Sequence, residues 1–176
     1  ALEKPLVVDF PREHPLADED TDNVPELQAL IDRKTIEEMC IDYFSGGIRS
    51  KGFEYFFDEN FELDINGIVV TGFDEVRDLY RRVMEDKPRL TGTFRMILSN
   101  FLIEVEGDKA TAQFLWTQTL NDTIKGPPRF IEQGWEVDAL IRQNGKWRIS
   151  KRVVTADSGL PDMMDDTYDP RPDYTL

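Results

Sequence analysis

The half of the chain after Pro88 constrains the fold most, because it consists of four long segments with strand patterns separated by turn signals. The segments are residues 91–106, 109–121, 129–143 and 146–155, and the breaks are Gly107-Asp108, Gly126-Pro127-Pro128 and Asn144-Gly145. An Asn-Gly pair between two alternating runs is the strongest short-range signal for a β-hairpin. This half therefore predicts four long antiparallel strands.

The preceding half is mostly helical in pattern. Apolar residues at helical spacing begin at Pro25 and continue through Tyr43 to the stop signal Gly46-Gly47, with a capping-box spacing at Thr35 and Glu38. The segments that follow predict a short helix over 51–57, a strand over 60–65, a turn at Asn66-Gly67, a strand over 68–70 and a helix over 74–85. Helices grouped ahead of an antiparallel sheet indicate the α+β class. We expect a strongly curved, mainly antiparallel sheet wrapped around three N-terminal helices as a conical barrel.

This predicted body covers residues 24–155, between two segments of different composition. Residues 1–23 contain three prolines and an acidic run, which predicts an extended arm whose apolar start either docks on a neighbouring surface or remains a mobile terminus. Residues 156–176 contain six aspartates and three prolines, which predicts an acidic tail. Met163, Met164 and Tyr168 could lie over a cavity mouth, and a solvated tail is the alternative.

The charge and the rare residues exclude several classes of function. A net charge of −14 argues against binding nucleic acid or an anionic membrane. The chain shows no run long enough to span a bilayer and no secretory pattern at its start, and its single cysteine, Cys40, suits a reducing cytoplasm, where we expect the protein to reside. One cysteine and one histidine, His14, argue against a zinc site and against a nucleophile–histidine triad.

Several motifs between Ile31 and Val154 carry a resemblance to a known family. They are Tyr43-Phe44, the run from Phe57 to Ile65 leading to Gly67, Gly72-Phe73-Asp74-Glu75-Val76, Ser99-Asn100, Val105-Glu106-Gly107-Asp108-Lys109-Ala110 and Gly145-Lys146-Trp147-Arg148-Ile149. With these motifs the chain resembles the SnoaL-like branch of the nuclear transport factor two-like superfamily. The resemblance implies a conical barrel with a deep apolar pocket. It also implies acid–base chemistry without a cofactor or metal in many members, and a binding or association role in others.

Two departures from the pattern of the family's dehydratases bear on the chemistry. The strand position where these dehydratases carry a histidine holds Met96, with Arg95 beside it, and the region after the helix tyrosine reads Gly46-Gly47-Ile48-Arg49 instead of supplying an aspartate. A histidine–aspartate dyad is therefore missing. Proton transfer would have to use tyrosine, carboxylates or groups assisted by lysine or arginine.

Tyr43, Asp138 and Arg95 are the predicted catalytic residues. Tyr43 lies at or within one residue of the family's catalytic tyrosine, and a phenol can donate to a leaving or enolate oxygen. Glu136 and Asp138 are two residues apart on one strand, so they share a face. The family pattern favours an inward Asp138, whereas the apolar stripe from Trp135 to Ile141 favours burial of the opposite face.

The basic residues Arg95, Lys151 and Arg152 form a second candidate set, because one inward cation could stabilise an oxyanion. Strand parity allows only one of Lys151 and Arg152 to be internal unless a bulge intervenes. The predicted substrate-binding residues are aromatic, apolar or polar side chains on the expected inner wall: Tyr55, Phe94, Met96, Trp116, Gln118, Glu136 and Lys151.

These observations lead to the hypothesis of a cofactor-independent lyase or isomerase for an apolar, ring-bearing small molecule, with an aromatic ring as the favoured form. A finer form is dehydration and deformylation of a lignin-derived diaryl compound. Alternatives are a dehydratase or isomerase of a polyketide or steroid-like ring, or a non-catalytic binding or oligomerisation module such as a dioxygenase β subunit. Apolar residues on the outer strand faces predict a homodimer or homotrimer.

Overall fold

The computed structural model describes residues 24–85, 93–121, 123 and 125–157. The predicted arm and residues 158–176 of the predicted tail lie outside the described residues. The helical half contains α1 (Val24–Asp42), a π turn η2 (Tyr43–Gly47), α2 (Ile48–Lys51), α3 (Phe53–Phe56) and α4 (Gly72–Glu85). The strands are β1 (Phe57–Ile65), β2 (Ile68–Thr71), β3 (Thr93–Glu106), β4 (Lys109–Asn121), β5 (Arg129–Gln143) and β6 (Lys146–Ala156).

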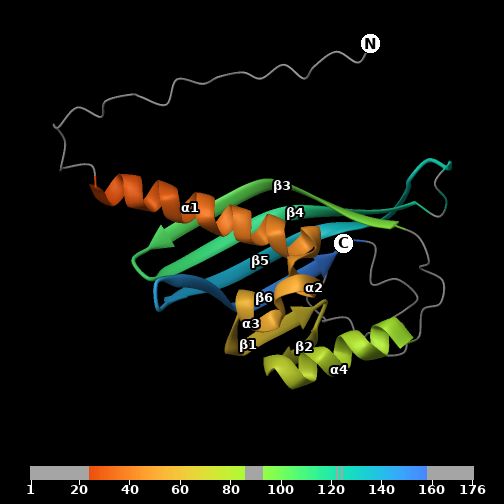
Figure 1. Cartoon of the computed structure of the whole chain (residues 1–176), viewed down its shortest axis with the longest axis horizontal. Helices are drawn as coiled ribbons and strands as arrows, with labels where there is room; N and C mark the ends of the chain where they lie inside the picture. Colours follow the sequence, from red (N-terminus) through yellow and green to blue (C-terminus); the bar gives the residue numbers. More distant parts are fainter. Residues whose placement is uncertain (1–23, 86–92, 122, 124, 158–176) are drawn as a thin grey trace, which may run out of the picture.

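The six strands form one mixed sheet in the order β2-β1-β6-β5-β4-β3 (Figure 1). Every pairing is antiparallel except that of β1 with β6. The predicted α+β class and element order are confirmed, because the helices precede the four long antiparallel strands in the sequence. The sheet is not closed, because β2 and β3 are its two edges, so the expected barrel is incomplete in the described residues.

Helix α1 is continuous through the position where the sequence suggested a capping box. The Thr35 hydroxyl donates to the Ile31 carbonyl at 2.7 Å, which is a bond back along the helix and not a cap. The α-helix gives way to the π turn at Tyr43. Within that turn, Gly46 leaves helical geometry, and its φ of +110° lies in the left-handed region that glycine adopts without strain. The resulting π turn carries Tyr43 into the core.

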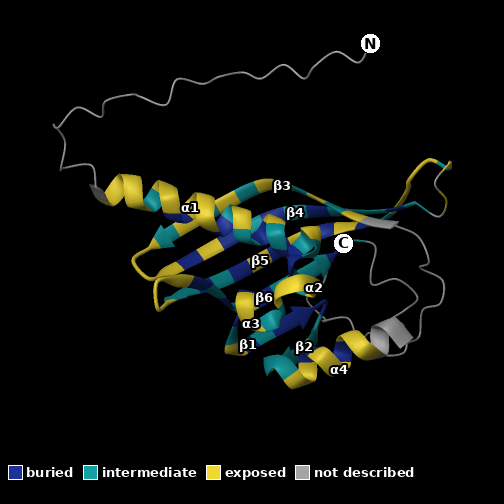
Figure 2. Ribbon diagram, viewed as in Figure 1, coloured by how far each residue is buried: buried dark blue, intermediate teal, exposed yellow. Residues whose placement is uncertain are grey.

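The core lies between the helices and one face of the sheet, which we call the inner face. Helix α1 packs across this face near β3, and α4 packs against β1 and β2 (Figure 1). Buried residues alternate with exposed ones along the central strands (Figure 2). The buried apolar cluster includes Ile36, Cys40, Tyr43, Phe56, Phe57, Phe61, Phe114, Leu140, Trp147 and Ile149. Among the described helices, none combines the length and apolarity needed to cross a membrane.

The opposite, outer face of the sheet carries a group of exposed apolar side chains. This outer patch consists of Ile97 and Leu102 on β3 and Trp135 and Val137 on β5. The strand register places these residues on one side, because Leu102 and Val137 both pair with Gln113, and Ile97 pairs with Thr117. The patch itself is uncharged, although the chain has a net charge of −14. We therefore expect two or three copies to associate through it, because contact there brings no like charges together.

Association through the outer patch predicts that Val137→Lys lowers the molar mass measured by size-exclusion chromatography with light scattering, because it would bury an unpaired ammonium. The matched control is Val69→Lys, since Val69 is also an exposed valine, on the edge strand β2. The control should keep the mass of the unsubstituted protein. A monomeric unsubstituted protein, or a Val137→Lys variant with unchanged mass, would contradict this prediction.

Candidate active site

A buried arginine and two buried carboxylates lie together on the inner face of the sheet. Arg152 of β6 and Glu136 of β5 are each 2% exposed, and Asp138 of β5 is 0% exposed. The Arg152 guanidinium binds Asp138 through two parallel hydrogen bonds of 2.8 Å, from Nε to Oδ1 and from Nη2 to Oδ2. Two-bond pairs of this kind are the strong and geometrically specific form of the arginine–carboxylate interaction.

Glu136 is held less completely than Asp138. Its Oε1 lies 2.8 Å from Nε of Arg152, yet no hydrogen bond reaches this buried oxygen from any described residue. One guanidinium therefore faces two carboxylates, and only Asp138 is fully satisfied by it. The arrangement leaves Glu136 as the carboxyl group that is available for proton transfer.

Arg152 reaches the inner face through a bulge in β6. Ile149 pairs with Leu140 and Lys151 pairs with Ala139, so Ser150 is one extra residue between two consecutive pairs. The Ser150 hydroxyl donates to the Ala139 carbonyl at 3.1 Å. Inserting one residue reverses which side chains of a strand face inward. Trp147, Ile149 and Arg152 are consequently all buried, although simple alternation would have buried Lys151.

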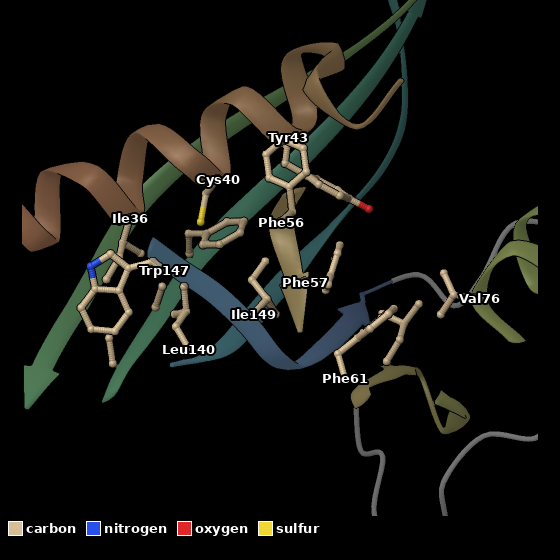
Figure 3. Close-up of a cluster of buried hydrophobic side chains, with 14 of the residues drawn as sticks. Ile36, Cys40, Tyr43, Phe56, Phe57, Phe61, Val76, Leu140, Trp147 and Ile149 are labelled. Atoms are coloured by element: carbon tan, nitrogen blue, oxygen red, sulfur yellow. The ribbon is translucent and has the colours of Figure 1, made fainter. Parts of the chain in front are cut away.

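Aromatic rings enclose the guanidinium on the helical side. Its carbon atom Cζ lies 4.4 Å from the ring centroid of Tyr43, 5.1 Å from that of Phe57 and 5.5 Å from that of Phe44. Contacts of a cation with ring faces at such distances are attractive, and more so when water is excluded. Figure 3 shows Cys40 of α1 and Tyr43 of η2 pointing into the layer that contains Phe56 and Phe57. The rings restrict the guanidinium to one orientation.

Burial changes the proton affinities of the groups in this cluster. Loss of solvent, together with the charge of Asp138, raises the pKa of Glu136 to about 8 against the opposing effect of Arg152. Burial, with a hydrogen bond to Tyr80, holds the pKa of the Tyr43 phenol well above its ordinary value. Burial opposes the charge of Arg152, but Asp138 and Glu136 outweigh it and raise the pKa of the guanidinium. Tyr43 thus stays protonated and Arg152 stays charged.

Cys40 also borders the cluster, with Sγ 4.0 Å from Oδ2 of Asp138. Burial and the charge of Asp138 raise the pKa of this thiol well above its ordinary value, so it remains a thiol. The described residues contain no group of three or more histidine, cysteine or acidic side chains able to hold a metal ion.

The conflict over β5 is settled in favour of the carboxylates. Glu136 and Asp138 face inward, whereas Trp135 and Val137 are 44% and 40% exposed. The apolar stripe is the outer one because the inward cation Arg152 compensates the carboxylates, which is information that the pattern of β5 alone does not contain. Gly134 continues the inner row, and a Cβ there would lie 1.9 Å from the Thr155 carbonyl oxygen and 2.9 Å from the Trp116 indole, so glycine lets the backbone of β6 and that ring approach β5 closely.

Several predicted binding residues share the inner face with Glu136. Trp116 is buried and pairs with Gly134, and Met96 and Gln118 are half-buried partners of each other across β3 and β4. Phe94 lies in β3 opposite Leu120, at a position of the same parity. These positions run from the cluster along β3 and β4.

Three predicted residues lie elsewhere. Arg95 is exposed and pairs with Thr119, which places it on the face opposite to Met96. Lys151 is 50% exposed and forms an ion pair of 2.6 Å with Glu62, so the prediction of Lys151 as an inward residue is corrected by the bulge at Ser150. Tyr55 is largely exposed on α3, beside a separate pocket.

Arg152 and Tyr80 complete the cluster; Arg152 was one of three candidate cations but was not chosen as a catalytic or substrate-binding residue, and Tyr80 was not predicted. A signal for Arg152 was present, since two inward carboxylates on one strand need a nearby cation. The bulge that selects Arg152 over Lys151 has no such signal. Tyr80 comes from α4, and nothing in its local sequence links it to Tyr43.

Comparisons with known proteins place this chain in a family. The family model described as "SnoaL-like domain" matches residues 28–153, so the chain belongs to the SnoaL-like family. The sequence motifs indicated the same family. No curated protein sequence matches the chain significantly.

Solved structures show the same fold. A variant of Rv3472 from Mycobacterium tuberculosis, a protein of unknown function, is 27% identical over 77% of this chain and 78% of that chain, with a TM-score of 0.62. A nuclear transport factor two-like protein from Novosphingobium aromaticivorans is 20% identical over 86% and 99%, with a TM-score of 0.62. Hexachlorocyclohexane dehydrochlorinase LinA-type3 from Novosphingobium barchaimii LL02 is 20% identical over 75% and 90%, with a TM-score of 0.59.

The first prediction concerns the neighbouring cations Arg152 and Lys151. Arg152→Met leaves two carboxylates buried together without a cation, so we expect a loss of about 3–5 kcal/mol in the free energy of unfolding. Lys151→Met removes only a half-exposed ion pair with Glu62 and should cost about 1 kcal/mol or less. Urea denaturation measures both values. Equal losses in the two variants would contradict the central role of Arg152.

The second prediction follows from the raised pKa of Glu136. An unfolded glutamate titrates near 4.5, whereas Glu136 in the folded protein titrates at about 8. The folded state therefore holds a proton that the unfolded state has lost, and the contribution of Glu136 to stability is lost as the pH rises through this interval. Urea denaturation between about pH 5 and pH 8 should show a steeper fall for the unsubstituted protein than for Glu136→Gln. Parallel curves would contradict the raised pKa.

Proposed function

We propose that this protein is a cofactor-independent lyase or isomerase in which Glu136 transfers the proton. The observation that carries the proposal is a buried glutamate with a pKa of about 8, ion-paired with an arginine and with one oxygen free of hydrogen bonds from the described residues. A general base is most effective when its pKa lies near the working pH. Groups with pKa values displaced in this way are concentrated at functional sites.

The neighbours of Glu136 then have distinct roles. Asp138, the carboxylate favoured by the sequence, has both oxygens bound by Arg152 and serves to fix the guanidinium. Arg152 in turn positions Glu136 and keeps its ionised form accessible. Tyr43 remains protonated, and its hydroxyl, which donates to Tyr80 in this structure, would turn that hydrogen bond to a substrate atom that becomes negative.

These roles suit an elimination. Ionised Glu136 takes a proton from a carbon next to the one that bears the leaving group. The electrons of that C–H bond form the new carbon–carbon double bond, and the leaving group departs with its bonding electrons while Tyr43 donates a hydrogen bond to it. In an isomerisation, Glu136 would return the same proton to a different carbon. Neither route requires a redox change.

The residues along the inner face support an apolar, ring-bearing substrate. Trp116, Met96 and Gln118 extend from the cluster with one polar amide among apolar groups, which is the usual composition of a small-molecule site. The fold relative from Novosphingobium barchaimii is a dehydrochlorinase of hexachlorocyclohexane, which is itself an apolar ring compound. A diaryl compound derived from lignin is the finer proposal within this substrate class.

The test is a turnover screen with γ-hexachlorocyclohexane, a diaryl propane and a hydroxylated bicyclic phenol. For any substrate that is converted, Glu136→Gln should lower kcat by about a hundredfold or more, because it removes the base. In the unsubstituted enzyme, kcat/KM should rise with pH and level off above about 8, as Glu136 ionises. The control Glu62→Gln, at a half-exposed ion pair, should retain full activity.

Tyr43→Phe separates the role of the phenol from that of the base. This variant keeps the ring that packs on Arg152 and loses only the hydroxyl, so we expect a lower kcat with an unchanged pH midpoint. Full turnover in both Glu136→Gln and Tyr43→Phe would remove this mechanism, whereas no turnover of any tested substrate by the unsubstituted protein would favour a binding module.

A further inference from the structure

A pocket lies outside the buried cluster, beside α1. This pocket has a volume of about 580 Å³ and lies between α1, Tyr55 of α3 and the β5–β6 turn. Its walls include Met39 and Thr35 on α1 and Lys146 and Arg148 after the turn. Neither Tyr43, Glu136 nor Arg152 lines it, so it is distinct from the proposed reaction site. Its volume is in the range of small-molecule sites.

The floor of the pocket is rigidly built. The Trp147 indole is 5% exposed, and its Nε1 donates to Oδ1 of Asp32 at 3.3 Å. Nη2 of Arg142 donates to Oδ2 of the same carboxylate at 2.5 Å, and the Arg142 guanidinium lies 4.5 Å from the Trp147 ring centroid. These contacts hold the floor in one arrangement without a ligand, so binding would need little ordering of side chains.

An exposed aromatic ring forms one wall. Tyr55 is 44% exposed although its ring lies 4.6 Å from Nζ of Lys51 and 5.7 Å from Cζ of Arg148. Met39 on the α1 side supplies an apolar surface to the same hollow. A flat ring could pack between these two walls.

The charged residues around the pocket differ in how they are paired. Each acidic residue of the lining is already paired: Asp32 with Arg142 at 2.5 Å, Asp42 with Lys51 at 2.5 Å and Glu38 with Lys34 at 3.7 Å. Lys146 and Arg148 have no ion-pair partner among the described residues, and Arg148 has only a hydrogen bond of 2.9 Å to the Trp147 carbonyl. The lining holds three acidic and three basic side chains, and Lys146 and Arg148 are the two of these cations that no carboxylate of the described residues neutralises by direct contact.

We propose that this pocket binds a small aromatic carboxylate. The carboxylate lies between Lys146 and Arg148, whose remaining N–H groups can donate to both of its oxygens. The ring lies against Tyr55 and Met39. This site is separate from the elimination at Glu136 and stands whether or not that reaction occurs.

The experiment is isothermal titration of the full chain with 2-naphthoate, and with uncharged 2-naphthamide as the matched ligand. We expect 2-naphthoate to bind and 2-naphthamide to bind at least about tenfold more weakly, because it lacks the charge. Lys146→Gln and Arg148→Gln should each weaken naphthoate binding by about tenfold. The control Lys125→Gln removes an exposed lysine of the β4–β5 connection and should leave binding unchanged.

Glu136→Gln distinguishes this pocket from the buried cluster, and it should bind 2-naphthoate with unchanged affinity. No binding of 2-naphthoate, equal binding of the amide, or unchanged affinity in both cation variants would overturn the proposal. Loss of binding in Glu136→Gln would also overturn it, since the ligand would then occupy the buried cluster. Lys146 and Arg148 lie at the surface, and thermal melts of their variants should match that of the unsubstituted chain.

Discussion

The interaction of Arg152 with Asp138 and Glu136 is the constraint on which the arrangement of the central sheet depends. Two carboxylates on one face of β5 can enter the interior only if a cation enters with them, since an isolated buried charge is very costly. The bulge at Ser150 brings that cation inside, because it reverses the alternation of inward and outward side chains between Ile149 and Arg152. The apolar stripe of β5 is then left on the outer face, so one ion cluster decides the orientation of two neighbouring strands.

The same cluster connects the fold with the proposed chemistry. Asp138 accepts two hydrogen bonds from the Arg152 guanidinium. Glu136 lies close to the positive charge, but its nearest oxygen accepts no hydrogen bond from the described residues. Burial then raises the pKa of Glu136 to about 8, while the protonated Tyr43 covers the guanidinium from the end of α1. The π turn and Gly46 end that helix where its last aromatic residue meets the sheet. Structural stabilisation and the proposed proton transfer thus depend on the same few residues.

Much of the fold could be predicted from the sequence, and less of the site. Strands β4 and β5 begin and end where the turn signals placed them, because such turns are local properties of glycine, proline and asparagine. That Glu136 and Asp138 lie on the same face of β5 was also predictable from strand periodicity. Which of Lys151 and Arg152 faces inward could not be predicted. A single bulge residue exchanges their orientations and leaves the composition and periodicity of the strand nearly unchanged.

The sequence by itself determined the order of helices and strands, the α+β class and the family, since these follow from short-range patterns and local motifs. Only the tertiary structure decided which face of β5 is buried, which cation accompanies it and that Tyr80 meets Tyr43. It also decided that Tyr55 lines a pocket together with Lys146 and Arg148. These outcomes depend on residues far apart in the chain, whose charges and volumes must balance in three dimensions before any one of them can be buried.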